Sequence, residues 1–125
     1  MPAAQAIALR TLVVEDDADT CEMLSRALQA EGFHPECASS AGAALVKLET
    51  GLTPAAAIID MRLPDASGGT VLWRIRRRDR TIPVAVVTGL RDAASHPEIL
   101  REPPDRLFTK PVDLVELIAW LKSVT

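Results

Sequence analysis

Short apolar runs alternate with amphipathic helical patterns along the whole chain of 125 residues, and this alternation restricts the fold more than any other feature. We predict strands at residues 11–14, 33–38, 55–60, 82–88 and 106–110. Helical spacing of apolar residues predicts helices at residues 18–30, 41–50 and 68–79, and a last helix that begins after Asp113. Three prolines leave room for only a short helix within residues 92–104. Strands that are apolar on both faces and alternate with helices are typical of a parallel sheet covered on both sides.

Pro35 limits where the weakest predicted strand, residues 33–38, can lie in this sheet. Proline has no backbone N–H to donate, so this strand is expected at a sheet edge. Right-handed crossovers then favour a doubly wound α/β sheet with five parallel strands in the order 2-1-3-4-5, the (βα)5 arrangement of flavodoxin-like folds. We expect a single domain at residues 9–125, preceded by a flexible tail at residues 1–8.

Polar side chains stand at the carboxyl ends of four predicted strands. Glu15, Asp16 and Asp17 follow the first strand, Asp60 ends the third, Thr88 ends the fourth, and Lys110 ends the fifth. The carboxyl ends of parallel strands meet at one edge of a sheet, where open α/β sheets bind their ligands. Strands 1 and 3 are neighbours in the predicted order, so Glu15, Asp16 and Asp60 are expected to converge. Asp17 is more simply explained as a helix cap.

Three carboxylates at short distance repel one another, and a divalent cation with oxygen ligands removes that repulsion. Mg²⁺ suits an open site of this kind, because it keeps several of its water ligands. Lys110 and Thr88 would supply a cation and a hydroxyl to an anionic group with three oxygens, and Asp60 would be a carboxylate nucleophile. These are the components of phosphoryl transfer. Each residue taken alone is more often a cap or a turn residue, but suitable groups on four separate strands argue against that explanation.

Four short motifs carry a resemblance to a known family. They are "LVVEDD" with Glu15 and Asp16, "IIDMRLPDASG" with Asp60, "VVTG" with Thr88, and "FTKP" with Lys110. Over residues 10–122 the chain resembles the receiver domain of the response regulators of two-component signalling. Each motif alone is weak, whereas the four in this order are specific.

The resemblance implies a role for each of the acidic positions. Asp60 would accept a phosphoryl group from the phosphohistidine of a histidine kinase or of a histidine phosphotransfer protein. Asp16, Asp60 and the backbone carbonyl of Arg62 would bind Mg²⁺, with Glu15 acting through a water molecule.

The resemblance also implies roles for Thr88, which would donate a hydrogen bond to the phosphoryl group, and for Lys110, which would pair with it. A receiver is not otherwise an enzyme: it catalyses its own phosphorylation and slow autodephosphorylation, and its output is binding to other proteins.

Two positions depart from the family pattern. Leu107 stands where the family usually has an aromatic switch residue that responds to the hydroxyl group, here Thr88. Neighbouring Phe108 is expected in the core, on the opposite face of its strand. Leu90 cannot orient an attacking water, so we expect slow autodephosphorylation. The prolines of residues 92–104 weaken the usual dimerisation face, so a monomer or a weak dimer is expected.

Two tryptophans lie beside the predicted apolar stripes of their helices rather than within them. Trp73 stands among four arginines at positions 74, 76, 77 and 78. It belongs either to a solvated arginine-rich face or to a surface that anchors a binding partner. Trp120 flanks the apolar stripe of the last helix, and the same two interpretations apply to it.

The two cysteines have no metal-binding spacing. Cys21 shares a helical face with Leu24 and Leu28, so we expect a buried, unreactive thiol there. A reducing, cytoplasmic compartment is consistent with this interpretation of Cys21 and Cys37.

Charge and hydropathy exclude some partners. A formal net charge of −3 argues against a general nucleic-acid binder, and no apolar run approaches the length of a membrane span. The start of the chain does not have the architecture of a signal peptide.

Several functional alternatives stay open within the receiver interpretation: a free-standing regulator without an effector domain, a phosphate shuttle or sink, and a receiver fragment of a hybrid histidine kinase. A non-phosphorylated pseudo-receiver is disfavoured because every site position is filled. A flavin-binding protein of the same fold would have a Ser/Thr/Gly-rich loop where "EDDADT" stands. A phosphatase with an aspartate nucleophile would have a second acid in place of Arg62.

Overall fold

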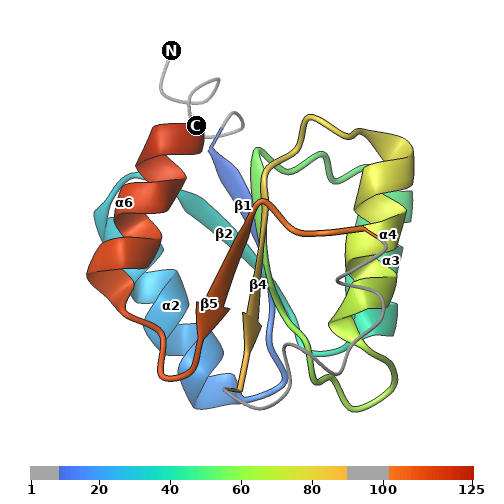
Figure 1. Cartoon of the computed structure of the whole chain (residues 1–125), viewed down its shortest axis with the longest axis horizontal. Coiled ribbons are helices and arrows are strands. Elements are labelled where there is room, and N and C mark those ends of the chain that lie inside the picture. The colour runs from blue at the N-terminus through green and yellow to red at the C-terminus, as the bar shows by residue number, and fades with distance from the viewer. Residues whose placement is uncertain (1–8, 90–101) are drawn as a thin grey trace.

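The structure, a computed structural model, describes residues 9–89 and 102–125. Its strands are β1 (Arg10–Val14), β2 (His34–Ala38), β3 (Ala56–Asp60), β4 (Val84–Thr88) and β5 (Arg106–Thr109). Its described helices are α2 (Ala18–Ala30), α3 (Ala41–Glu49), α4 (Gly68–Arg78) and α6 (Leu114–Val124). All strand pairs are parallel, and the order is β2-β1-β3-β4-β5. Helices α2 and α6 cover one face of the sheet, and α3 and α4 cover the other (Figure 1). The predicted doubly wound α/β fold is confirmed.

Burial of the central strands explains why they are apolar on both faces. Every residue of β3 and β4 is buried. Neighbouring residues of a strand point to opposite faces. Ile59 therefore packs in the cluster that includes Leu72 of α4, whereas Ile58 packs in the cluster that includes Leu117 of α6.

The two edge strands differ from the central ones as the sequence predicts. Strand β2, which contains Pro35, lies at one edge and has one fully buried residue, Ala38. Strand β5 lies at the other edge, where Phe108 is buried and Leu107 is exposed. The expected core position of Phe108 is confirmed.

Each described helix begins at a side chain that accepts hydrogen bonds from its first turn. These caps are Asp17 for α2, Ser40 for α3, Ser67 for α4 and Asp113 for α6. A cap side chain satisfies backbone N–H groups that have no partner within the helix. The predicted roles of Asp17 and Asp113 as caps are confirmed.

The proposal of a partner surface at Trp120 is wrong. Its side chain is 9% exposed and packs edge-to-face on Phe108, with ring centroids 6.3 Å apart. The buried face of α6 is therefore wider than its aliphatic stripe. Trp120, at the border of that stripe, extends its large ring between the helix and β5. Trp73, in contrast, is 45% exposed, and the guanidinium of Arg77 lies 4.7 Å from its ring centroid.

Arg76 does not belong to the solvated arginine-rich face that is one of the two interpretations of this part of α4. It is buried and donates hydrogen bonds to the carbonyl of Ile82 at 2.8 Å and to Asp105 at 2.9 Å. Asp105 also accepts from the backbone N–H of Val84 at 2.7 Å. Arg76 thus connects α4 to the starts of β4 and β5.

The expectation of free thiols is also wrong, because Cys21 of α2 and Cys37 of β2 form a disulfide. The residues are 16 positions apart in sequence, but α2 lies against β2 and brings their Cα atoms to 6.7 Å. Cys21 is buried, as predicted, whereas Cys37 is exposed. None of the helices in the described part of the chain is long and apolar enough to cross a bilayer.

Candidate functional site

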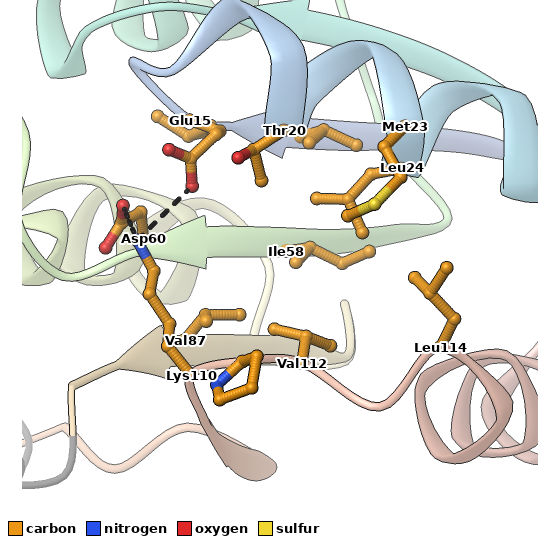
Figure 2. Close-up of a pocket in the computed structure, with 13 residues that line it drawn as sticks. Glu15, Thr20, Met23, Leu24, Ile58, Asp60, Val87, Lys110, Val112 and Leu114 are labelled. Carbon is orange, nitrogen blue, oxygen red and sulfur yellow. Dashed lines mark hydrogen bonds and ion pairs between the residues drawn. The ribbon is translucent and has the colours of Figure 1, made fainter.

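Residues that follow three different strands meet at the carboxyl edge of the sheet. Asp60 ends β3, Glu15 follows β1, and Lys110 follows β5 (Figure 2). The Lys110 Nζ donates to Asp60 Oδ2 at 2.8 Å and lies 3.8 Å from Glu15 Oε2. Glu15 and Asp60 are only 5% and 4% exposed, so the acidic side of this ion pair is shielded from water, whereas the Lys110 side chain is 43% exposed.

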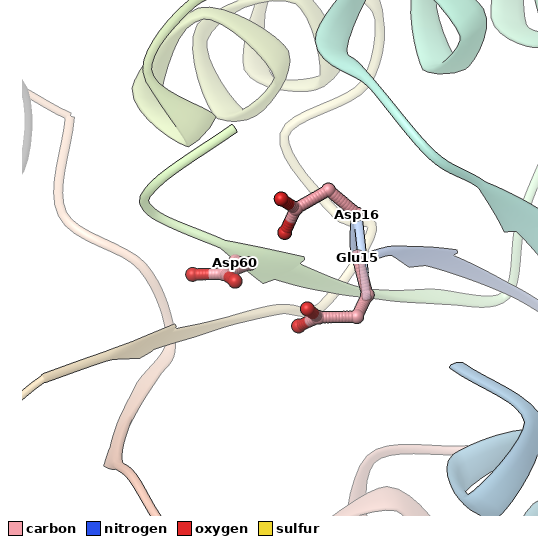
Figure 3. A group of neighbouring side chains, drawn as sticks. All are labelled: Glu15, Asp16 and Asp60. Carbon is pink, nitrogen blue, oxygen red and sulfur yellow. The ribbon is translucent and has the colours of Figure 1, made fainter. Parts of the chain in front are cut away.

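Asp16 completes a cluster of three carboxylates with Glu15 and Asp60 (Figure 3). One oxygen of each residue lies within 4.8 Å of the others, and Asp16 is the exposed member. The convergence predicted from the strand order is confirmed. The three side chains lie close together because β1 and β3 are hydrogen-bonded neighbours in the sheet.

The backbone around Asp60 is held from both sides. The N–H of Met61 donates to the carbonyl of Val87 at 2.9 Å, and the N–H of Gly68 donates to the carbonyl of Met61 at 2.8 Å. A Cβ atom at Gly68 would lie 2.2 Å from the Asp60 carbonyl oxygen. Only glycine permits this approach of α4 to the end of β3. The N–H of Arg62 donates to Asp60 Oδ1 at 3.1 Å and orients the carboxylate.

Glu15 is fixed by hydrogen bonds at its backbone and its side chain. Its N–H donates to the carbonyl of Ala38 in β2 at 3.0 Å. Its Oε1 accepts from the N–H of Asp17 at 3.1 Å. The first acid of the cluster is therefore attached to the edge strand and to the start of α2.

The electrostatics of the cluster follow from burial and from like charges. The pKa of Glu15 is raised to about 7: burial is the largest cause and the charge of Asp60 adds to it, against the lowering effects of the Asp17 N–H and of Lys110. Burial alone would lower the pKa of Lys110, but its hydrogen bond to Asp60 and the attraction of the three acids outweigh this, and the pKa of Lys110 is raised. Lys110 is therefore firmly protonated at neutral pH, whereas Glu15 holds its negative charge with difficulty.

The donor set fits a hard divalent cation. Carboxylate oxygens are the ligands that Mg²⁺ prefers, and Mg²⁺ usually combines one or two of them with water. Three ionised carboxylates with one ammonium would leave a formal charge of −2, which a divalent ion balances. Asp16 and Asp60 could bind directly, and the backbone carbonyl of Arg62 stands two residues after Asp60.

Of the remaining predicted positions, the structure describes Thr88 and Leu107. Thr88 is buried at the end of β4, next to β3, and its hydroxyl donates to the carbonyl of Gly89 at 3.4 Å. The backbone N–H of Lys110 donates to the carbonyl of Thr88 at 2.9 Å. Leu107 is exposed on β5, two residues before the end of that strand. Leu90 lies outside the described residues, as do most of residues 92–104 and the predicted tail.

A cavity of about 550 Å³ opens beside the cluster, and the sequence patterns do not reveal it (Figure 2). Its charged end is formed by Glu15, Asp60 and Lys110. Its other walls are mostly apolar and come from the strands, from α2, from the segment after β5 and from the start of α6: Val13, Val14, Thr20, Met23, Leu24, Ile58, Val87, Pro111, Val112 and Leu114. Met23 is 48% exposed, and an exposed methionine within a helical pattern is the one signal that could have indicated an apolar opening.

Comparison with known proteins supports these features. The profile of the response regulator receiver domain matches residues 11–122. The transcriptional regulatory protein PrrA of Mycobacterium leprae is 31% identical over 115 residues, which are 92% of this chain and 49% of PrrA. The chain therefore spans about half the length of this curated relative.

Two solved structures share the fold along nearly their whole length. A CheY-like response regulator receiver domain protein from Methanospirillum hungatei superposes with a TM-score of 0.83 at 28% identity, covering 91% of this chain and 90% of that one. The response regulator TrrA of Thermotoga maritima, solved in complex with Mg²⁺–BeF, superposes with a TM-score of 0.82 at 27% identity, covering 93% and 98%.

Proposed function

Because this chain belongs to the response regulator receiver domain family, we propose that Asp60 accepts a phosphoryl group from the phosphohistidine of a histidine kinase or a histidine phosphotransfer protein. The observation that carries this proposal is the buried Asp60 carboxylate, which ends a rigid strand and receives a hydrogen bond from Lys110 at 2.8 Å. A nucleophile held in this way needs little reorientation before attack.

In the proposed reaction, an oxygen of Asp60 attacks phosphorus and forms an acyl phosphate. The bond between phosphorus and the imidazole nitrogen breaks, and the donor histidine keeps the electron pair. Lys110 neutralises charge on the transferred group, and the Thr88 hydroxyl donates a hydrogen bond to one of its oxygens. Water later hydrolyses the acyl phosphate slowly, since Leu90 provides no group to orient it.

The acidic cluster would hold Mg²⁺ through Asp16, Asp60 and the backbone carbonyl of Arg62, with Glu15 acting through a water molecule. When bound, the ion supplies positive charge to the phosphoryl oxygens. Support comes from the carboxylates within 4.8 Å of one another and from the relative TrrA, solved with Mg²⁺–BeF.

Output is proposed to occur through protein binding. Trp73 and the guanidinium stacked on it form an exposed aromatic and cationic pair on α4 of the kind that interfaces favour. The absence of a nucleic-acid partner is proposed for residues 9–125 alone, since PrrA is named a transcriptional regulatory protein and this chain spans 49% of it. A phosphate sink or a fragment of a hybrid kinase would use the same chemistry at Asp60.

Phosphoramidate tests this proposal, because its phosphorus–nitrogen bond resembles that of phosphohistidine. The protein is incubated with phosphoramidate and Mg²⁺ and then reduced with borohydride, which converts an aspartyl phosphate to homoserine. Peptide mapping should locate homoserine at position 60. Conversion at another aspartate, or none in the folded protein, would overturn the assignment of Asp60.

A further inference from the structure

A covalent bond joins the start of α2 to the edge strand on the face of the sheet that holds the cavity. Cys21 lies in the first half of α2 and is buried beside Leu24 and Leu28. Cys37 lies in β2 and is exposed. Their Cα separation of 6.7 Å falls within the range of protein disulfides. None of the chemistry assigned to Asp60 uses these sulfurs.

We propose that Cys21 and Cys37 are a reversible thiol–disulfide modification site for small thiols and disulfides of the glutathione class, and that its oxidised form stabilises the acidic loop of residues 15–17 for metal binding. The second part of this inference rests on the proposed function of the acidic cluster. The first part stands independently of it.

The difference in exposure determines which sulfur reacts. A thiolate can reach only the exposed Sγ of Cys37, where it forms a mixed disulfide and expels Cys21 as the thiolate. A second thiol then attacks the mixed disulfide, releases Cys37, and leaves two protein thiols and one small-molecule disulfide. In the reverse direction, glutathione disulfide takes up the two electrons and the two thiol protons and leaves as two glutathione molecules. The Ser25 hydroxyl lies 3.1 Å from Cys37 Sγ, where it can donate a hydrogen bond to the sulfur.

The surroundings accommodate the reduced form as well. The Cys21 thiol would stay in an apolar cluster, which suits a small, weakly polar side chain. Cys37 Sγ lies 3.9 Å from the backbone carbonyl of Cys21, so its thiol would have an acceptor. Each thiol would therefore have compatible surroundings after reduction.

Two hydrogen bonds connect the cysteine pair to the acidic loop. Glu15 donates its N–H to the carbonyl of Ala38, the residue after Cys37, at 3.0 Å. Cys21 donates its N–H to the carbonyl of Asp17 at 2.9 Å. The disulfide thus completes a ring that runs from the acidic loop along α2, across to β2 and back. Reduction opens this ring, and the additional freedom of the loop must then be lost again when a metal binds.

Thiol trapping tests the modification itself. The full chain is equilibrated in buffers of different glutathione redox ratio, unfolded in denaturant that contains excess alkylating reagent, and weighed intact. We expect one transition between a form with both cysteines alkylated and a form with neither, the latter about 2 Da lighter than the unalkylated dithiol. Two cysteines that remain alkylatable in excess glutathione disulfide would overturn the proposal.

Single variants test the assignment of the reactive sulfur. Cys21→Ser should accumulate a stable glutathione adduct at Cys37, whereas Cys37→Ser should leave Cys21 unmodified in the folded protein. The opposite pattern would contradict attack at Cys37. Asp60→Asn should show the same redox transition as the wild type, so failure of phosphorylation and failure of this inference are distinguishable.

Calorimetric titration with Mg²⁺ tests the connection to the acidic loop. We expect the oxidised protein to bind Mg²⁺ about threefold to tenfold more tightly than the reduced protein. This is the effect of a disulfide that removes part of one residue's backbone freedom before the metal binds. The double variant Cys21→Ser/Cys37→Ser should bind Mg²⁺ with the affinity of the reduced protein, in oxidising and in reducing buffer alike. Equal affinities of the oxidised and reduced wild type would contradict the second part of the inference.

Discussion

Lys110 Nζ lies 2.8 Å from Asp60 Oδ2, although fifty residues separate the two in sequence. The contact crosses β4, which lies between β3 and β5 in the sheet. It connects the proposed nucleophile to the cation that would balance the transferred group. Asp60 is 4% exposed, so the interaction is stronger than an ion pair in water.

Replacement of Lys110 by glutamine should slow phosphorylation of Asp60 by about 100-fold, since a charged group aimed at a transferring group contributes on that scale. The measurement is the initial rate of phosphoprotein formation from phosphoramidate at saturating Mg²⁺. Lys122→Gln is the matched control, because Lys122 pairs with Glu31 away from the cluster. An unchanged rate in Lys110→Gln would remove the lysine from the mechanism.

Glu15 should give stability a specific pH dependence in the absence of metal. Its pKa is raised to about 7 in the folded state from an ordinary value of 4.5, so the folded protein binds more protons between these values. The stability that protonation provides is complete below about pH 4.5 and is lost as the pH rises through 7.

Denaturant titrations in EDTA at several pH values should therefore show wild type losing stability relative to Glu15→Gln as the pH rises from 5 to 8. Only the difference between the two proteins is informative, because other groups titrate in both. Parallel pH curves for the two proteins would show that Glu15 does not titrate in this range.

Gly68→Ala should damage the site through the backbone. The added Cβ would lie 2.2 Å from the Asp60 carbonyl oxygen and 2.9 Å from Cγ2 of Ile59. Overpacking of this kind costs about 1–3 kcal/mol of unfolding free energy, and the end of β3 must shift to relieve it. We expect lower stability together with weaker Mg²⁺ binding. The control is Thr70→Ala on the exposed side of α4, and equal behaviour of the two variants would contradict the close approach.

Arg76→Ala should be the most destabilising arginine substitution on α4. It removes a buried side chain and leaves the carbonyl of Ile82 without the guanidinium donor, while the carboxylate of Asp105 keeps the Val84 N–H but loses its cationic partner. A loss of about 2 kcal/mol or more is expected from the broken pair. Arg77→Ala, whose guanidinium stacks on exposed Trp73, should change stability by less than about 0.5 kcal/mol. Equal effects in chemical unfolding would show that Arg76 is not a structural connection.

The fold and the acidic cluster were predictable because both depend on the residue types within each strand and on general rules for the order of parallel strands. Apolar runs identify the buried strands, Pro35 places one of them at an edge, and the parallel order brings Glu15 and Asp60 together. Each of these steps needs only the residue types and their sequence positions.

The wrong predictions share a different cause, which is contact between elements distant in sequence. The helical pattern alone predicts that Arg76 is solvated. The structure shows that it pairs with Asp105, which is 29 residues away in sequence. The helical pattern likewise places Trp120 beside the apolar stripe, and only its contact with Phe108 of β5 shows that it is buried. The disulfide depends on how α2 lies against β2, which residue spacing does not encode.

A similar contact holds the loop after β3, where Asp65 accepts hydrogen bonds at 2.9 Å from the backbone N–H groups of both Ala41 and Gly42. These bonds lower the pKa of Asp65. The side chain thereby caps α3 from a loop 23 residues further along the chain, and no local pattern predicts such a cap.

Intact mass spectrometry with acetyl phosphate tests whether Asp60 is the phosphoacceptor. Wild type and Asp60→Asn are incubated with the donor and Mg²⁺, with and without EDTA, and circular dichroism verifies that both are folded. We expect a gain of about 80 Da in the wild type alone, abolished by EDTA. A folded wild type that gains no mass, or an Asp60→Asn variant that gains as much, would contradict this role of Asp60.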